Sequence, residues 1–220
     1  MPEIRNLFSD KAKLGKLILK RSFYERDTSA AARDLLGKIL ITKSENFELK
    51  DEFCAGKIVE DEAYYGLNDP ASHACKGATP RSKIMFETPG IAYVYFCYGN
   101  HFLLNAVTEK YGIAGAVLIR GIEPLEGISL MFKRREADML KNLTNGPGKL
   151  TKAFGIGKNF NGIDLTDINS PIFIIDGKEL RLYPEINKND IVKKSRIGIK
   201  NGAESLLRFY IKNNKFISKK

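Results

Sequence analysis

The sequence predicts an α+β fold: one domain over residues 1–220, with a curved, mostly antiparallel β-sheet flanked by helices and a protruding β-hairpin. A chain of 220 residues has the usual length of a single domain. Its short strand-like runs do not alternate regularly with helices, as they would in a doubly wound parallel sheet. That alternative also lacks a Gly-rich phosphate loop, since Gly155-Ile-Gly157 has no third glycine.

The N-terminal part predicts one short helix. Residues 27–37 are rich in alanine, Asp27 or Thr28 can cap the first turn, and Gly37 can end the helix. Two extended runs and one irregular segment are expected next: a strand over 38–42, an extended run over 57–64 and a long loop over 68–88. Long loops of this kind are often functional.

A β-hairpin is predicted in the middle of the chain. Residues 91–98 and 101–107 are aromatic and β-branched runs that flank Gly99-Asn100. The remaining elements are expected to be a strand over 116–119, helices over 126–140 and 147–154, and strands over 171–175, 196–199 and 207–211.

The chain is basic. It has 36 Lys and Arg against 26 Asp and Glu, a net charge of +10 and a pI near 9.4. The last thirty residues hold nine basic side chains and a single Glu. This pattern suggests a polyanionic partner, with a solvated Lys-rich surface as the alternative.

Cysteine usage and hydropathy favour an intracellular protein. Cys54, Cys75 and Cys97 have no metal-finger spacing, so each is expected to be a small buried hydrophobic side chain in a reducing compartment. The first twenty residues mix charges with leucines and show no signal peptide, and the longest apolar run, 91–98, is too short to span a bilayer. We expect a soluble protein of the cytoplasm or nucleoid, or of the nucleus in a eukaryote.

Three acidic residues stand together in the run 57–64. If the run is extended, Glu60, Glu62 and Tyr64 share one face and Asp61 points the other way. One interpretation is a solvated, salt-bridged edge strand, and another is a pocket in which a buried carboxylate acts as general base. A metal site made by Glu60, Glu62 and His73 is a third interpretation, although their spacing matches no established ligand motif.

Aromatic side chains crowd the first strand of the hairpin. Tyr93 and Phe96 are expected in the core, as most strand aromatics are. Tyr98 lies next to the turn and cannot easily reach the core, so on a basic protein it could act as a wedge that enters a base stack.

The order of these motifs resembles the alkyladenine (3-methyladenine) DNA glycosylase family over roughly residues 23–213. Several separate motifs in the same order are more specific than any one alone. The segments that carry the resemblance are residues 32–37, 56–64, 69–73, 79–81, 85–86, 93–95, 98–99, 117–120, 123–124, 146–150 and 208–210, together with Asn105.

This resemblance implies the removal of alkylated purines from duplex DNA. Glu62 would be the general base that activates water, and Arg120 would hold that water and keep Glu62 ionised. The other implied roles are an aromatic base pocket of Tyr64, His73 and Tyr95, rejection of the exocyclic amine of guanine by Asn105, and the wedge Tyr98. The enzyme would be a monofunctional hydrolase without lyase activity, and it would need no metal or cofactor.

The expected substrates are 3-methyladenine and 7-methylguanine, with hypoxanthine and ethenoadenine as further candidates. The expected partner is double-stranded DNA that contains damaged purines, bound by a monomer with no membrane involved. Candidate contacts to the DNA backbone are Lys149, Lys193, Lys194, Arg196 and Lys200, where Arg196 could instead lie close to the pocket. Two small departures from the family pattern are Gly121, where Ala is usual, and Ser82, where Asn is common.

The implied pocket constrains the hairpin. A two-residue turn at Gly99-Asn100 would put Tyr95 and Asn105 on opposite faces of the sheet. We therefore expect a three-residue loop or a bulge, which shifts the register by one residue. Two other functions stay open at this stage: a module that binds damaged nucleic acid without cutting it, and an unrelated small-molecule enzyme or metal hydrolase.

Overall fold

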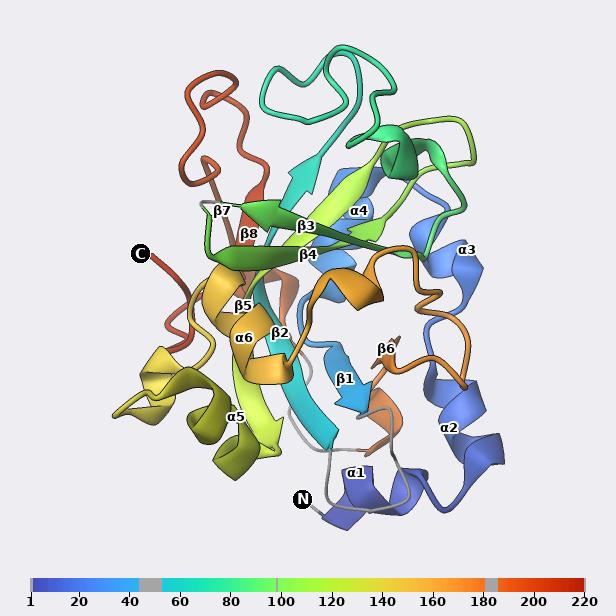
Figure 1. The fold of residues 1–220 in the computed structure, drawn as a ribbon, viewed down its shortest axis with the longest axis vertical. Coiled ribbons are helices and arrows are strands. Elements are labelled where there is room, and N and C mark those ends of the chain that lie inside the picture. The colour runs from blue at the N-terminus through green and yellow to red at the C-terminus, as the bar shows by residue number, and fades with distance from the viewer. Residues whose placement is uncertain (1, 44–52, 98, 181–185, 220) are drawn as a thin grey trace.

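The computed structural model describes residues 2–43, 53–97, 99–180 and 186–219, and within them it contains six α-helices and eight strands (Figure 1). The helices are α1 (Pro2–Leu7), α2 (Lys11–Leu17), α3 (Arg21–Tyr24), α4 (Thr28–Leu35), α5 (Ile128–Arg135) and α6 (Pro147–Phe154). The strands are β1 (Ile39–Lys43), β2 (Phe53–Tyr64), β3 (Ala92–Cys97), β4 (His101–Val107), β5 (Ala116–Glu126), β6 (Ile172–Ile175), β7 (Ile191–Lys194) and β8 (Arg208–Ile211).

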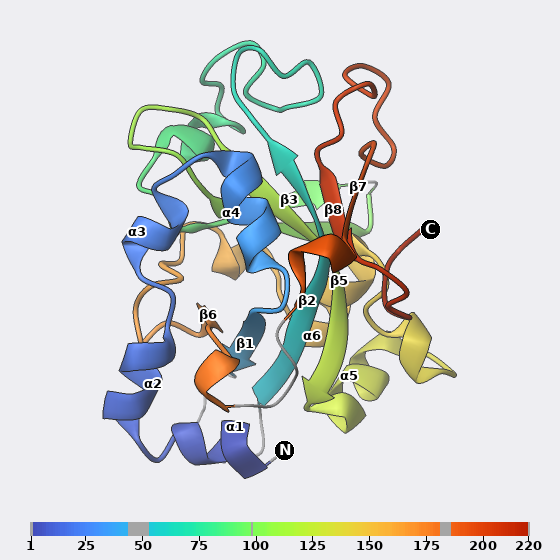
Figure 2. The same cartoon turned by 180° about the vertical axis from the view of Figure 1, so that it is seen from behind.

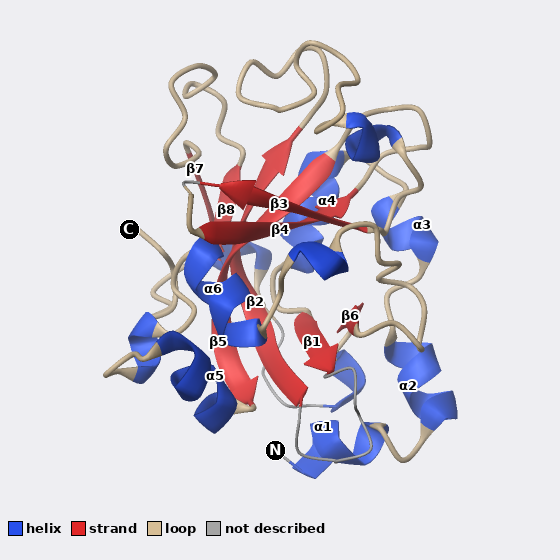
Figure 3. Ribbon diagram, viewed as in Figure 1, coloured by secondary structure: helices blue, strands red, loops and turns tan. Residues whose placement is uncertain are grey.

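One curled antiparallel sheet organises the molecule, which confirms the α+β prediction (Figure 3). Its main path runs β3-β4-β5-β2-β1-β6, and β8 joins β2 while β7 joins β8. The long strand β2 is therefore interior: it pairs with β5 along one side, and with β1 and then β8 along the other. The carboxylates of β2 do not lie on an edge strand, so that interpretation is wrong.

The hairpin has the predicted irregular register. Cys97 pairs with His101, so three positions, 98–100, lie between the paired residues. Tyr93 stands opposite Asn105 and Tyr95 opposite Leu103, which places these four side chains on one face of the sheet. Gly99 has a φ of 73°, a left-handed conformation that glycine adopts without strain.

The two faces of the upper sheet have different surroundings. Helix α4 covers one face, where Ala31, Ala32 and Leu35 pack with Val117 and Ile119 in the main core (Figure 2). The amphipathic pattern of α4 and its N-cap, the side chain of Asp27 accepting from the Ala30 amide, explain why the predicted helix forms there. The other face carries Glu60, Glu62 and Tyr64 and is left for the site.

Several boundaries differ from the prediction. The expected strand over 196–199 is wrong, because the strand that pairs with β8 is β7, and residues 195–207 form a loop. The helix predicted from residue 126 begins at Ile128, since pairing with β2 extends β5 to Glu126. Helices α1, α2 and α3 were not expected.

Two expectations about burial also need correction. Phe96 is 52% exposed rather than part of the core, because it points away from Tyr95 and contacts only the partly buried ring of Phe102 at 5.1 Å among the described aromatic pairs. Cys54 is buried as expected, but Cys75 and Cys97 are partly exposed. Among the described residues, no helix combines the length and the apolar character that crossing a membrane would require.

Candidate functional site

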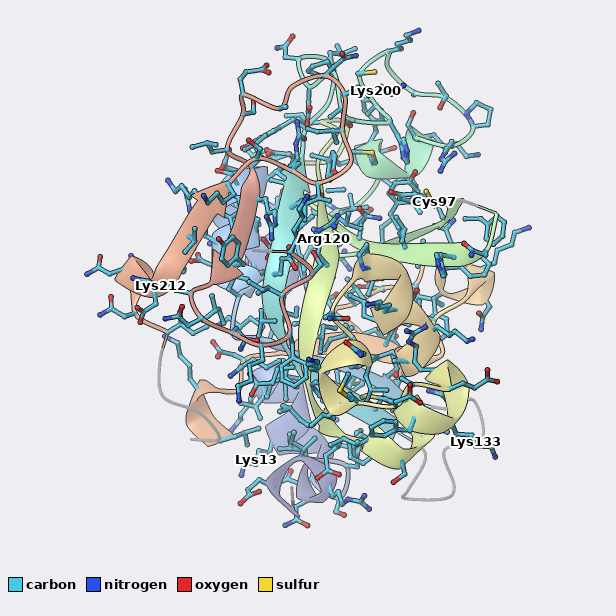
Figure 4. All side chains as sticks on the ribbon, turned by 90° about the vertical axis from the view of Figure 1, so that its left-hand side faces the viewer. Lys13, Cys97, Arg120, Lys133, Lys200 and Lys212 are labelled. Carbon is cyan, nitrogen blue, oxygen red and sulfur yellow. The ribbon has the colours of Figure 1, made fainter. Side chains whose placement is uncertain are left out.

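A cavity of about 490 Å³ opens on the carboxylate face of the sheet, a volume that suits a small ligand. Its walls come from β2, the hairpin β3–β4, β5, the start of α6 and two loops. Figure 4 faces this side of the molecule, with Arg120 near the centre, below Lys200 and to the left of Cys97 in this view. The side chains used below that line it are Tyr64, His73, Tyr93, Tyr95, Asn105, Arg120 and Lys149.

Glu62 lies directly behind the cavity wall. Its side chain is fully buried, and three donors that line the cavity hold both oxygens. Oε2 accepts from Tyr64 Oη at 2.8 Å and from Arg120 Nη1 at 3.2 Å, and Oε1 accepts from the backbone amide of Ile197 at 2.6 Å. The structure thus brings the two predicted catalytic residues into contact.

Burial and these donors act in opposite directions on Glu62. Burial raises the pKa of the carboxyl, and Arg120, the Ile197 amide and the Tyr64 hydroxyl lower it in part. The balance is a pKa above the usual range, which makes the carboxylate a stronger base than an exposed glutamate. A carboxylate with such a pKa, next to an arginine and a cavity, is typical of a catalytic site.

Three aromatic rings form one wall. The rings of His73 and Tyr95 meet edge to face at 4.7 Å, and the ring of Tyr93 lies 5.1 Å from that of Tyr95. Nδ1 of His73 lies 2.9 Å from the hydroxyl of Tyr93. Burial and the nearby cation of Arg81 lower the pKa of His73, so its imidazole is neutral at physiological pH.

Arg81 had no predicted role and lies outside this aromatic wall. Its guanidinium stands 4.8 Å from the centre of the Tyr95 ring and donates to the carbonyl of Phe96 at 3.2 Å. The cation therefore fixes the orientation of Tyr95 through a cation–π contact. The motif Thr79-Pro-Arg81 was the available sequence signal, but it does not reveal which side chain Arg81 contacts.

Asn105 lies in the cavity floor, almost fully buried. Its Nδ2 donates to the backbone carbonyl of Tyr93 at 3.0 Å, across the hairpin. This bond fixes the side-chain amide against the strand, so Asn105 presents a rigid surface to anything in the cavity.

The comparison with known proteins identifies the family. The family model for methylpurine-DNA glycosylase (MPG) matches residues 22–215. This chain belongs to the methylpurine-DNA glycosylase family. Three similar relatives carry the name "Putative 3-methyladenine DNA glycosylase": one from Prosthecochloris aestuarii is 45% identical over 94% of this chain and 92% of the relative, one from Carboxydothermus hydrogenoformans is 43% identical over 93% and 100%, and one from Clostridium perfringens is 45% identical over 92% and 99%.

In this methylpurine-DNA glycosylase family member, Arg196 is not an exposed phosphate contact. It is only 4% exposed, and its guanidinium forms a two-pronged salt bridge with Asp69 at 2.6 and 2.7 Å. It also donates to the carbonyl of Ala63 at 3.0 Å and lies 4.6 Å from the centre of the Tyr64 ring. The expectation for the DNA backbone is therefore wrong for Arg196, and the alternative position beside the pocket is correct.

The four predicted lysines lie in different places. Lys149 lines the cavity at the first turn of α6 and donates to Asn145 Oδ1 at 2.8 Å. Lys200 is exposed on the loop beside the cavity (Figure 4). Lys193 lies beside Ala30 and Arg33 of α4, on the face away from the cavity, and its predicted contact with the DNA backbone stays a prediction. Lys194 follows it on β7 and is exposed. The predicted wedge, Tyr98, lies outside the described residues.

The side chains of the metal alternative have other partners. Glu60 bonds with Arg208 and Ser218, Glu62 with Arg120, and His73 with Tyr93. Among the described residues, no three His, Cys, Asp or Glu side chains are grouped as a metal site would require.

Proposed function

We propose that this protein removes alkylated purines from duplex DNA by hydrolysing the bond between base and deoxyribose, and leaves an abasic site. Membership of the methylpurine-DNA glycosylase family supports the reaction class. The observation that carries the proposal is the Glu62–Arg120 pair, 3.2 Å apart, immediately behind an aromatic cavity.

The cavity is the proposed site of the extruded base. A base inside a duplex must be flipped out before the bond can be reached, at a cost of a few kcal/mol that is smaller for damaged or mispaired bases. The electron-rich rings of Tyr64, His73 and Tyr95 would attract a cationic alkylpurine by about 0.5–2 kcal/mol through cation–π contact. This preference supports 3-methyladenine and 7-methylguanine as substrates, while hypoxanthine and ethenoadenine are neutral and need protonation to leave.

Asn105 would exclude normal guanine by size. Because its Nδ2 is committed to the carbonyl of Tyr93, the side chain cannot turn aside for an exocyclic amine. A rigid floor rejects a larger base edge more strongly than a mobile one, because accommodation would break a buried hydrogen bond.

Glu62 would accept a proton from the water that attacks the sugar carbon. The transition state is oxocarbenium-like, as in other glycoside hydrolysis, and a cationic base leaves readily. Glu62 is fully buried, so the water reaches it only if a neighbouring group moves. Tyr64 would be that group, because its hydroxyl bonds to Glu62 and its ring would contact the extruded base. A general base contributes typically about 10²–10⁴-fold to the rate.

The proposed reaction stops at the abasic site. Strand cleavage by a glycosylase uses an amine that attacks the sugar. Lys149 is the one lysine among the described cavity-lining residues, and its amine is held by Asn145. We therefore expect intact strands after base release, and breaks only after alkali treatment.

The decisive experiment measures release of 7-methylguanine from methylated duplex DNA, with binding to an abasic-analogue duplex in parallel. We expect release by the wild type, and for Glu62→Gln a loss of release with retained binding. Binding without release by either protein would replace the enzyme with a damage-recognition module. If the wild type neither bound the duplex nor released the base, a role on DNA would be contradicted altogether.

A further inference from the structure

Among the described residues, Arg120 makes three polar contacts, one of which is with Glu62, the proposed general base. Nη1 faces Glu62 Oε2, Nε lies 3.6 Å from Glu60 Oε1, and Nη2 donates to Ser218 Oγ at 3.4 Å. Two carboxylates thus compete for one guanidinium. The stronger the attraction of Arg120 to Glu60, the less firmly Arg120 is held at Glu62.

Glu60 is satisfied largely by a segment from the far end of the chain. Its carboxylate is fully buried and accepts from Arg208 Nε at 2.6 Å. It also accepts from the backbone amide of Ser218 at 2.5 Å and from the Ser218 hydroxyl at 2.9 Å. If Glu60 lost the two Ser218 donors, its buried carboxylate would depend more on its two guanidinium neighbours, Arg208 at 2.6 Å and Arg120 at 3.6 Å. Arg120 would then be drawn toward Glu60 and away from Glu62.

The Ser218 hydroxyl bridges the two groups. It donates its single hydrogen to Glu60 and accepts from Arg120 Nη2, so both roles of the hydroxyl are used at once. Ser218 therefore holds Glu60 in place and steadies the end of Arg120 that does not face Glu62.

The segment Asn214–Lys219 is anchored on both sides of this bridge. Asn214 Nδ2 donates to Glu123 at 3.1 Å, and Ile217 is buried against Val59 and Tyr210. Arg208 Nη2 donates to the carbonyl of Lys219. In Figure 1 the segment is drawn in red and returns alongside the sheet after β8.

Gly121 leaves room for this approach. A Cβ at residue 121 would lie 2.7 Å from the carbonyl oxygen of Phe216 and 3.2 Å from Glu60. A side chain there would push the segment away from the carboxylate cluster. The absence of a side chain at Gly121, the residue after Arg120, therefore allows Ser218 to reach Glu60.

We propose that the segment Asn214–Lys219 completes the active site, with Ser218 and Glu60 as positioning residues that hold Arg120 against Glu62. This inference rests on the proposed glycosylase function. It assigns the segment to the hydrolytic step and not to DNA binding.

The test compares Ser218→Ala with Ser218→Thr, which keeps a hydroxyl, and with Lys212→Ala, an exposed control that lies outside the segment. Single-turnover release of 7-methylguanine from methylated duplex should slow about tenfold in Ser218→Ala, the equivalent of one hydrogen bond. Release should recover in Ser218→Thr and stay unchanged in Lys212→Ala. Affinity for an abasic-analogue duplex should be the same in all four proteins.

A second variant approaches the same contact from the other side. Gly121→Ala keeps every polar partner but displaces the Phe216 carbonyl, so it should also slow release without weakening DNA binding. Unchanged release in both Ser218→Ala and Gly121→Ala would overturn the proposal. So would an equal loss in Ser218→Thr, because that loss would reflect packing rather than the hydroxyl.

An NMR measurement separates this proposal from the proposed function. The Nε–H resonance of Arg120 should shift in Ser218→Ala and stay near its wild-type position in Ser218→Thr, whatever the protein does to DNA. If the wild type released no base, the glycosylase function would fail while this shift still reported the contact. An unmoved resonance in Ser218→Ala would contradict the positioning role directly.

Discussion

Asp61 is a buried acid that the proposed mechanism does not use. Its side chain is fully buried opposite Ile119 and Phe209, and neither oxygen has a hydrogen-bond partner among the described residues. Burial, together with the charges of Glu60 and Glu62, raises its pKa well above the usual range. The folded protein therefore holds a proton on Asp61 under conditions in which the unfolded chain releases it.

This difference predicts a pH-dependent cost in stability. Because the folded pKa is the higher one, the contribution of Asp61 is fully present below its unfolded pKa and is lost as the pH rises toward the folded pKa. Over that range the free energy of unfolding of the wild type should fall by up to about 1.4 kcal/mol per pH unit relative to that of Asp61→Asn, whose side chain cannot ionise. Urea unfolding of both proteins between pH 4 and 8 measures the gap, and a gap independent of pH would contradict the assignment.

Tyr64 lines the proposed base pocket and bonds to the proposed catalytic carboxylate of Glu62. Its hydroxyl bond lowers the pKa of Glu62, so Tyr64→Phe should raise that pKa while it keeps the ring. Glu62 must be ionised to accept a proton, and the acidic limb of the release rate should therefore move to higher pH. Tyr93→Phe is the matched control, because its hydroxyl contacts His73 instead. The same displacement in both variants would show that the Tyr64 bond is not its cause.

At the level of elements, a buried salt bridge joins two loops over the cavity. Asp69, on the loop after β2, holds Arg196, on the loop after β7, and Asp69 also accepts from the amide of Tyr65. Removing one partner of a buried pair typically costs about 3–5 kcal/mol, because the other charge is left uncompensated. Asp69→Ala should lower the free energy of unfolding by this amount.

The matched control is an exposed pair. Asp34→Ala removes the partner of Arg26 at the surface, where an ion pair contributes at most about 1 kcal/mol. Chemical unfolding of both variants decides the point. Equal, small losses would show that the Arg196 bridge does not clamp the loops.

The predicted helices and strands are correct where the local sequence signals agree with the strand pairing of the folded protein. The caps of α4, the Pro147 start of α6 and the aromatic runs of the hairpin are local, and these elements form as expected. The requirement that Tyr95 and Asn105 share a pocket predicted the three-residue loop. The alternation Ile197-Gly198-Ile199 looks like a strand, but β8 takes Ile191–Lys194 as its partner, a choice that depends on distant residues.

The candidate site was predicted less completely than the fold around it. The motif of residues 60–64 brought Glu62 and Tyr64 together, and Arg120 followed from the resemblance. The contacts of Glu62 with the Ile197 amide, and of Glu60 with Arg208 and Ser218, join residues more than 130 positions apart in the chain. No spacing rule connects such positions, so only the folded structure reveals them.

At the scale of the whole molecule, the net charge of +10 favours DNA, and its distribution decides which cations matter. Lys200 lies beside the cavity, whereas Lys193 lies on the α4 face. Lys200→Ala should reduce the slope of log K against log salt concentration by about one, and Lys193→Ala should leave it unchanged. Both slopes are measured from the affinity for duplex DNA between about 50 and 200 mM salt, a range over which phosphate contacts change the affinity strongly. Equal slopes for the two variants would show that the DNA backbone does not lie against the surface that carries Lys200.

The hydrogen bond between Glu60 and Ser218 can form only late in the synthesis of the chain. These residues are 158 positions apart, and the sheet strands that flank Glu60 are made before Ser218 emerges from the ribosome. A nascent chain can therefore pair β2 with β5 while the arginine beside Glu62 still lacks its last support, and β8 and Ile217 join the sheet and core only with the segment that carries Ser218. If Ser218 positions Arg120, a polypeptide nicked before this segment would keep the β2–β5 ladder and yet hydrolyse poorly.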